Sequence, residues 1–194
     1  MKNSDRTILL ALGFELALGW IGLLIAWLTG LSLGSQFIWD WPGMFQGLAA
    51  TVPMLGLLGL LIRSRWSPLV ELRQQVDELL GKLFHHSTLW EMALVSFAAG
   101  VGEELLFRGV LQQLLQQWID PLLALLLVGL LFGLAHAMSA TYFVLATLAG
   151  IYLGWLALAC GNLVPPMIAH GLYDFVALWC LREARNEGRG SRSE

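Results

Sequence analysis

Residues 89–111 of the chain read LWEMALVSFAAGVGEELLFRGVL, an apolar run interrupted by two adjacent carboxylates and an arginine. The run is long enough to cross the roughly 30 Å of hydrocarbon in a bilayer as a helix. Because charged side chains are costly in hydrocarbon, Glu103, Glu104 and Arg108 indicate a functional cluster rather than a solubility feature. This stretch therefore predicts a membrane helix that carries a polar site.

The composition of the whole chain also indicates a membrane protein. Of its 194 residues, 57% are hydrophobic and 13% are charged, whereas soluble domains average roughly 45–50% apolar and about 25% charged residues. The basic residues form short groups and not a continuous stripe with interleaved aromatics, so a nucleic-acid partner is not expected. The expected surroundings of the chain are a lipid bilayer.

Apolar runs of about 20 residues predict an all-α, polytopic membrane bundle of about six transmembrane helices. Between the second and third runs, residues 67–86 have apolar side chains on one helix face, which predicts an interfacial amphipathic helix. We expect residues 1–182 to form a single transmembrane domain and the polar residues 183–194 to form a disordered tail. The six apolar runs are residues 8–28, 42–62, 89–111, 121–138, 142–160 and 163–181.

The basic residues predict the topology. Apart from Arg108, all of them lie at the N-terminus, after the second apolar run or in the tail. Six crossings place these three regions on one side of the membrane, and the excess of Lys and Arg marks that side as cytoplasmic. We expect a multi-pass protein of the plasma (inner) membrane with both termini in the cytoplasm. The basic residues in question are Lys2, Arg6, Arg63, Arg65, Arg73, Lys82, Arg182, Arg185, Arg189 and Arg192.

The acids inside the apolar runs differ in their surroundings. Glu104 and Arg108 are spaced i, i+4 with the acid first, the favoured orientation for an ion pair on a helix. Glu103 points about 100° away around the helix, so it must face a wet cavity, take a proton or meet another helix. Such a carboxylate suits a general base, although a purely structural Glu-Glu-Arg cluster is the alternative. Glu15 and Glu91 have no such companions, and we expect them to be structural or interfacial.

Two later runs supply histidines. The fourth run ends with FGLAH, which places Phe132 and His136 on one helix face, and the sixth contains HGLYD, which does the same for His170 and Asp174. Together with Glu103, these side chains provide the carboxylate, the imidazoles and the dry surroundings that amide hydrolysis needs. Asp174 can fix the orientation of His170, as carboxylates do beside catalytic imidazoles.

The motifs GEELLFRG (102–109), FGLAH (132–136) and HGLYD (170–174) resemble, in order and spacing, three motifs of a known family. It is the CAAX protease and bacteriocin-processing family of intramembrane endopeptidases, also called the Abi family. The motif-bearing core covers about residues 89–181. The resemblance implies an all-helical membrane protease with its active site in a cavity of the bundle and a membrane-associated protein or peptide as substrate.

The resemblance also implies roles for individual residues. Glu103 would activate the hydrolytic water and His136 would help to hold it. His170 and Asp174 would stabilise the oxyanion. Family members that process prenylated proteins carry Asn at the last motif position, and Asp174 donates a hydrogen bond only when protonated, so orienting His170 is its alternative role. The residues that would shape the site are Glu104, Arg108 and Phe132.

The chemistry of the predicted site leaves alternatives open. Glu103, His136 and His170 form a His-His-carboxylate set that could hold a catalytic zinc, as in a metalloprotease. Because the three come singly from separate runs and no His-Glu-x-x-His pairing is present, catalysis by glutamate without a cofactor is favoured. A proton or cation relay would use the same side chains, but the first two runs contribute almost no polar residues to a path. A non-catalytic bacteriocin-immunity or membrane scaffold protein is the remaining class.

Overall fold

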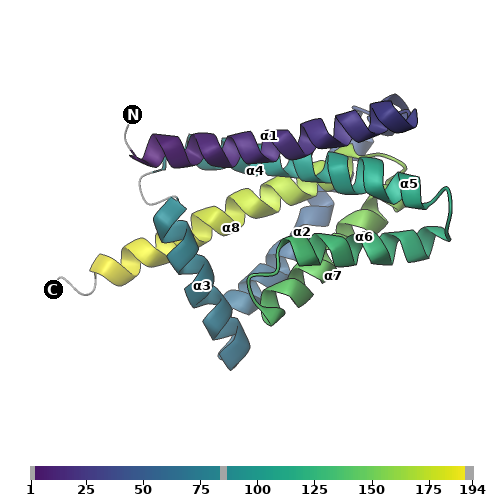
Figure 1. The fold of residues 1–194 in the computed structure, drawn as a ribbon. Helices are drawn as coiled ribbons and strands as arrows, with labels where there is room; N and C mark the ends of the chain where they lie inside the picture. Colours follow the sequence, from purple (N-terminus) through teal and green to yellow (C-terminus); the bar gives the residue numbers. More distant parts are fainter. Residues whose placement is uncertain (1–2, 84–86, 191–194) are drawn as a thin grey trace.

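Helices are the regular elements of the described residues, 3–83 and 87–190, in this computed structural model (Figure 1). The prediction of an all-α fold is confirmed, because no strand occurs in this part of the chain. The elements are α1 (Asn3–Thr29), the short 3-10 helix η1 (Gly34–Gln36), α2 (Trp41–Arg63), α3 (Ser67–Leu83), α4 (Leu89–Glu104), the π-helix η2 (Leu105–Gln112), α5 (Gln113–Leu115), α6 (Pro121–Ala135), α7 (Ala140–Cys160) and α8 (Val164–Gly190).

Four of these helices are long and apolar enough to cross a membrane, namely α1, α2, α7 and α8. The apolar helix α6 has 15 residues. The elements α4, η2 and α5 follow one another without a break, so the predicted third run is a continuous helix of mixed type. Each of the six apolar runs thus coincides with helical structure, and the chain is an integral membrane protein with a polytopic helical bundle.

The third run differs from its prediction in one respect. The spacing of its residues predicts a regular α-helix, but the hydrogen bonds after Glu104 follow the wider π pattern as far as Gln112. Segments of π-helix are rare and occur mostly at functional sites, where they change the direction in which successive side chains point. Here the change of pattern begins immediately after the two adjacent glutamates.

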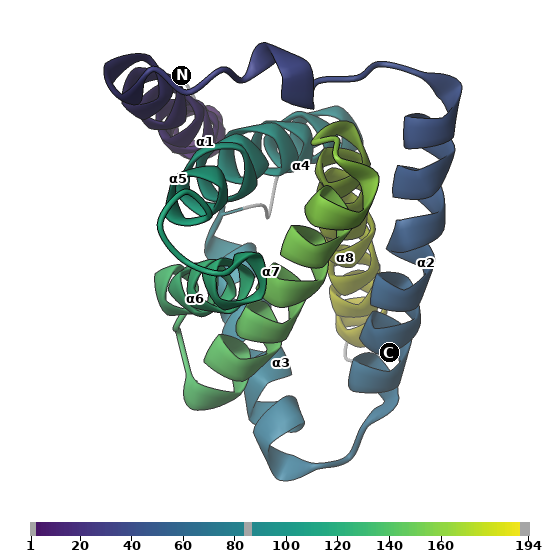
Figure 2. The ribbon, with the colours of Figure 1, turned by 90° about the vertical axis from the view of Figure 1, so that its right-hand side faces the viewer.

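The helix α8 lies at the centre of the bundle. It packs against α2, α4 and α7, while α1 packs along α4 and η2, and α6 pairs with α7. Figure 2 shows α8 between α2 on one side and α4 and α7 on the other. The start of α1 and the end of α8 lie at the same end of the bundle, and α3 crosses obliquely near that end (Figure 1).

The end of the chain differs from its prediction. We expected a disordered tail from residue 183, but α8 continues as a helix to Gly190. Residues 183–190 contain no proline, and several of them are good helix formers, so the helix has no strong local reason to end at the last apolar residue. Residues 191–194 lie outside the described part of the chain, as do residues 84–86 at the end of the predicted amphipathic helix.

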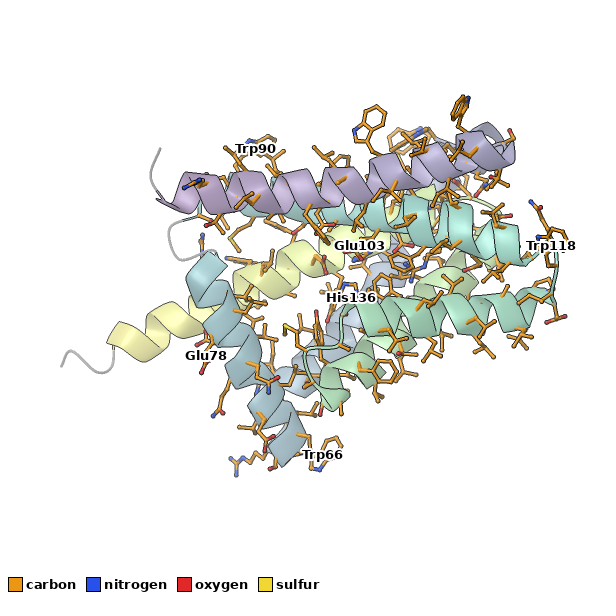
Figure 3. The ribbon with its side chains drawn as sticks, viewed as in Figure 1. Trp66, Glu78, Trp90, Glu103, Trp118 and His136 are labelled. Carbon is orange, nitrogen blue, oxygen red and sulfur yellow. The ribbon has the colours of Figure 1, made fainter. Side chains whose placement is uncertain are left out.

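Exposed tryptophans lie at both ends of the helix formed by α4, η2 and α5. Trp90 lies in its first turn and Trp118 follows its last, and 70% and 84% of their surfaces are exposed. Figure 3 shows the two residues toward opposite ends of the molecule. Because tryptophan is enriched at both membrane interfaces, this placement supports a helix that spans the bilayer.

Glycines allow α4 to approach α1 and α8 closely. A Cβ atom at Gly102 would collide with the backbone carbonyl oxygen of Glu15 in α1. A Cβ atom at Gly100 would lie 2.8 Å from both the carbonyl oxygen of Met167 and the amide nitrogen of Gly171 in α8. Small residues at helix contacts are a common device in membrane bundles, where packing replaces the hydrophobic effect. The backbones of α1 and α8 are therefore each in direct contact with α4 just before Glu103 and Glu104.

We predict that Gly102→Ala destabilises the fold, because the added methyl group must push α1 away from α4. The expected cost is about 1–3 kcal/mol, measured as a lower thermal unfolding temperature in detergent. Gly13→Ala is the matched control in α1, where an added Cβ meets nothing within 4 Å. It should leave the unfolding temperature unchanged or raise it. Equal unfolding temperatures for the two variants would contradict the described contact.

Candidate active site

The carboxylate of Glu104 is the centre of a buried polar network. Its Oε1 atom accepts hydrogen bonds from Arg108 Nη1 and His170 Nδ1, both at 2.8 Å. The Glu104 and Arg108 side chains are fully buried, and 7% of the His170 side chain is exposed. The i, i+4 ion pair is therefore present as predicted, and it also reaches across to α8. A buried charge needs such partners, because an unpaired one would be strongly destabilising.

Arg108 extends the network to two more helices. Its Nη2 atom donates to the carbonyl oxygen of Gly150 in α7 at 2.9 Å. Its guanidinium carbon lies 4.4 Å from the centre of the Phe132 ring in α6, a cation–π contact. One turn further on, Gln112 donates in the same way to the carbonyl oxygen of Gly154 at 3.1 Å. The polar centre of the bundle thus joins α4, η2, α6, α7 and α8.

Glu103 faces a different partner from its neighbour. Its Oε2 atom lies 3.6 Å from Nε2 of His136, and the two side chains are 8% and 25% exposed. Figure 3 labels both residues in the interior of the bundle, between α4 and α6. We predicted helix to residue 138, but α6 ends at Ala135, so His136 lies on the connection to α7. This connection brings the imidazole to the depth of Glu103.

A hydrogen bond at its other nitrogen, Nδ1, fixes the orientation of the His136 ring. Nδ1 lies 2.8 Å from the carbonyl oxygen of Phe132. A carbonyl oxygen only accepts, so Nδ1 carries the hydrogen, and in the neutral ring Nε2 presents its lone pair toward Glu103. The ring also stacks on Phe132 with a centroid distance of 4.4 Å. The imidazole is held at one nitrogen by a hydrogen bond, and its other nitrogen faces Glu103.

His170 is held at both nitrogens. Besides Nδ1, which donates to Glu104, its Nε2 atom lies 3.5 Å from Oδ2 of Asp174, whose side chain is 32% exposed. The Phe132 ring lies edge-on to the His170 ring with a centroid distance of 5.8 Å. The residues from the three motifs therefore meet in one region, but the two imidazoles face different carboxylates on either side of Phe132.

Two residues that the sequence analysis did not assign to the site also lie here. Glu15 in α1 interacts electrostatically with Glu103, Asp174 and both imidazoles, and its Oε2 atom is buried without a hydrogen-bond partner among the described residues. We expected it to be structural or interfacial, without companions. Its charge within an apolar run was the available signal, but the glycine contact that brings α1 to α4 could not be read from the sequence. The second residue is Tyr142, whose ring lies edge-on to that of His136 at 6.2 Å.

The zinc alternative would use Glu103, His136 and His170 as ligands. Among the described residues, no group of three or more His, Cys, Asp or Glu side chains could hold a metal ion. The reason is visible in the geometry, because His170 directs its nitrogens to Glu104 and Asp174 and offers neither to the pair of Glu103 and His136. The pair that remains is one carboxylate oxygen and one imidazole nitrogen 3.6 Å apart.

The fold and the site define an integral membrane protein with a buried Glu-Arg-His network and an adjacent carboxylate–imidazole pair. Residues 85–176 match the family model described as type II CAAX prenyl endopeptidase Rce1-like. The match confirms the resemblance seen in the three motifs: over these residues the chain is similar to the CAAX protease family. This is a family of proteases, so the match supports a peptidase. No curated protein and no solved structure matches the chain.

We predict that Arg108→Met destabilises the protein strongly, because it leaves the buried carboxylate of Glu104 without its cation. Breaking a buried pair in this way costs about 3–5 kcal/mol. Thermal unfolding in detergent measures the effect. Arg65→Met is the matched control, since it makes the same change at an exposed position, where the cost should stay within about 0.5 kcal/mol. Similar losses in both variants would show that the network does not hold the fold.

Proposed function

We propose that the protein is an intramembrane endopeptidase of the CAAX type that hydrolyses a peptide bond of a membrane-associated protein or peptide. The observation that carries this proposal is the pair of Glu103 Oε2 and His136 Nε2, which lie 3.6 Å apart. Both atoms accept hydrogen bonds when Glu103 is ionised and His136 is neutral. A polar separation of this size suits a bridging water molecule, which can donate one hydrogen to each acceptor.

The proposed reaction begins with that water. Glu103 accepts one of its protons while the water oxygen attacks the carbonyl carbon of the substrate, and the carbonyl oxygen becomes an oxyanion. Glu103 then returns the proton to the peptide nitrogen as the carbon–nitrogen bond breaks, which releases a new carboxyl group and a new amine. His136 positions the water, and the hydrogen bond from its Nδ1 atom to Phe132 fixes the ring for that purpose.

The other motif residues support this pair. Glu104 and Arg108 hold α4, η2, α7 and α8 together next to Glu103, and we assign them a structural role in the site. Asp174 lies 3.5 Å from Nε2 of His170, which favours the orienting role over oxyanion binding. We propose that no metal takes part, because the His170 nitrogens face carboxylates of their own and not the Glu103–His136 pair.

The setting of the enzyme follows from the distribution of charge. We propose that both termini and the segment around α3 face the cytoplasm and that the membrane is the plasma (inner) membrane. The start of α1, the end of α8 and α3 lie toward one end of the bundle (Figure 1), and the basic residues outside the site are concentrated in these regions. An excess of Lys and Arg marks the cytoplasmic side.

The proposal predicts that Glu103→Ala abolishes proteolysis while the protein still folds and inserts. Protein termini are compared by mass spectrometry in cells that carry the intact protein, Glu103→Ala or no copy. Termini that require the intact protein should be missing with Glu103→Ala. Glu78→Ala is the control, because Glu78 is an exposed carboxylate on α3, away from the site (Figure 3), and it should behave like the intact protein.

Identical termini in cells with the intact protein and with Glu103→Ala would remove the protease proposal and favour a non-catalytic scaffold. A second experiment distinguishes catalysis by Glu103 without a metal from catalysis by zinc. The purified protein is treated with a chelator and assayed on a peptide that spans a terminus dependent on Glu103. Cleavage should continue at its original rate. Loss of cleavage that added zinc restores would show a metalloprotease instead.

A further inference from the structure

The proposed reaction creates a negative charge on the substrate's carbonyl oxygen, and this oxyanion needs a hydrogen-bond donor. Donors aimed at the developing charge often supply the largest single contribution to catalysis. The side chains of the site are rich in acceptors, however, because Glu15, Glu103, Glu104 and Asp174 are all carboxylates. When ionised, a carboxylate accepts hydrogen bonds and donates none. Ionised carboxylates therefore do not supply this donor.

The cationic and imidazole donors of the site are already engaged. Arg108 donates to Glu104 and to Gly150, and the Phe132 ring covers its guanidinium. The Nδ1 atom of His136 donates to the carbonyl oxygen of Phe132. The Nδ1 atom of His170 donates to Glu104, and its Nε2 atom faces Asp174. The donors with contacts of 2.8–2.9 Å would have to give up a hydrogen bond to reach an oxyanion, whereas His170 Nε2 has only the longer 3.5 Å approach to Asp174.

Tyr142 lies beside the pair of Glu103 and His136. It lies in the first turn of α7, directly after the connection that carries His136, and its ring meets the His136 ring edge-on with a centroid distance of 6.2 Å. It also interacts electrostatically with Asp174 and Glu103. Its backbone N–H donates to Ser139 Oγ at 3.2 Å, which fixes the start of α7 and with it the position of the side chain.

We propose that the Tyr142 hydroxyl is an oxyanion donor of this protein and hence a further catalytic residue. The inference rests on the proposed peptidase function. A phenol is a neutral donor over the working range of an enzyme near neutral pH, so it supplies what Asp174 does not. The place of Tyr142 at the N-terminus of α7 adds to the effect, because negative charge is favoured near that end of a helix.

In the reaction, the Tyr142 O–H hydrogen bond to the substrate's carbonyl oxygen shortens as the water attached to Glu103 attacks the carbonyl carbon. No proton leaves Tyr142. When the tetrahedral intermediate collapses, the carbonyl double bond re-forms, the carbon–nitrogen bond breaks and Glu103 delivers its proton to the leaving nitrogen. Tyr142 is then free to bind the next carbonyl oxygen.

The test is Tyr142→Phe, which removes the hydroxyl and keeps the ring against His136. The probe is a synthetic peptide that spans a terminus dependent on Glu103 in the cellular comparison. We expect kcat to fall about 10²–10³-fold, the usual cost of losing one oxyanion donor, while KM changes less than about threefold. Affinity for a phosphonamidate peptide of the same sequence, which mimics the tetrahedral intermediate, should fall by a similar factor.

Tyr152→Phe is the matched control in the same helix. Its hydroxyl donates to the carbonyl oxygen of Ala50 at 2.9 Å, away from the site, so its loss should leave kcat and phosphonamidate affinity unchanged. A kcat for Tyr142→Phe within about threefold of the intact protein would overturn the inference, as would equal losses in the two variants. Retention of cleavage by Glu103→Ala would instead overturn the proposed function itself.

Discussion

The buried carboxylate of Glu104 is the interaction on which the rest of the structure depends. One of its oxygens accepts hydrogen bonds from Arg108 on the same helix and from His170 on α8. Arg108 in turn binds the backbone of α7 and lies over Phe132 of α6. In a bilayer, helices gain little by burying apolar surface against one another, so a polar connection of this kind helps to specify how they associate.

The two neighbouring glutamates, Glu103 and Glu104, lie in different environments. Successive residues of a helix point in directions about 100° apart, so Glu103 and Glu104 meet different surroundings although they are adjacent in sequence. Glu104 is fully buried, paired with Arg108 and hydrogen-bonded to His170, whereas Glu103 lies beside a partly exposed imidazole. The first environment keeps a charge fixed, and the second suits a group that must exchange protons. Arg108 and Gln112 lie in the π-helix that follows, and both donate to carbonyl oxygens of α7.

Much of this arrangement could be predicted from the sequence, because the strongest signals were local. The apolar runs predicted the helices, and the i, i+4 spacing predicted the ion pair of Glu104 and Arg108. Contacts between distant helices were harder to foresee. Glu15 joins the site only because glycine backbones bring α1 against α4, and the early end of α6 and the π-helix have no clear sequence signal. The engagement of both His170 nitrogens likewise required the three-dimensional structure.

The central claim is that Glu103 performs the chemistry and Glu104 builds the site, and a paired measurement on Glu103→Gln and Glu104→Gln tests it most directly. Both substitutions remove one charge at adjacent positions. Glu103→Gln should keep its unfolding temperature within about 2 °C, since a change of about 0.5 kcal/mol moves it no further, and should lose cleavage. Glu104→Gln should unfold at a clearly lower temperature. Cleavage by Glu103→Gln, or an equal loss of stability in both variants, would contradict the account.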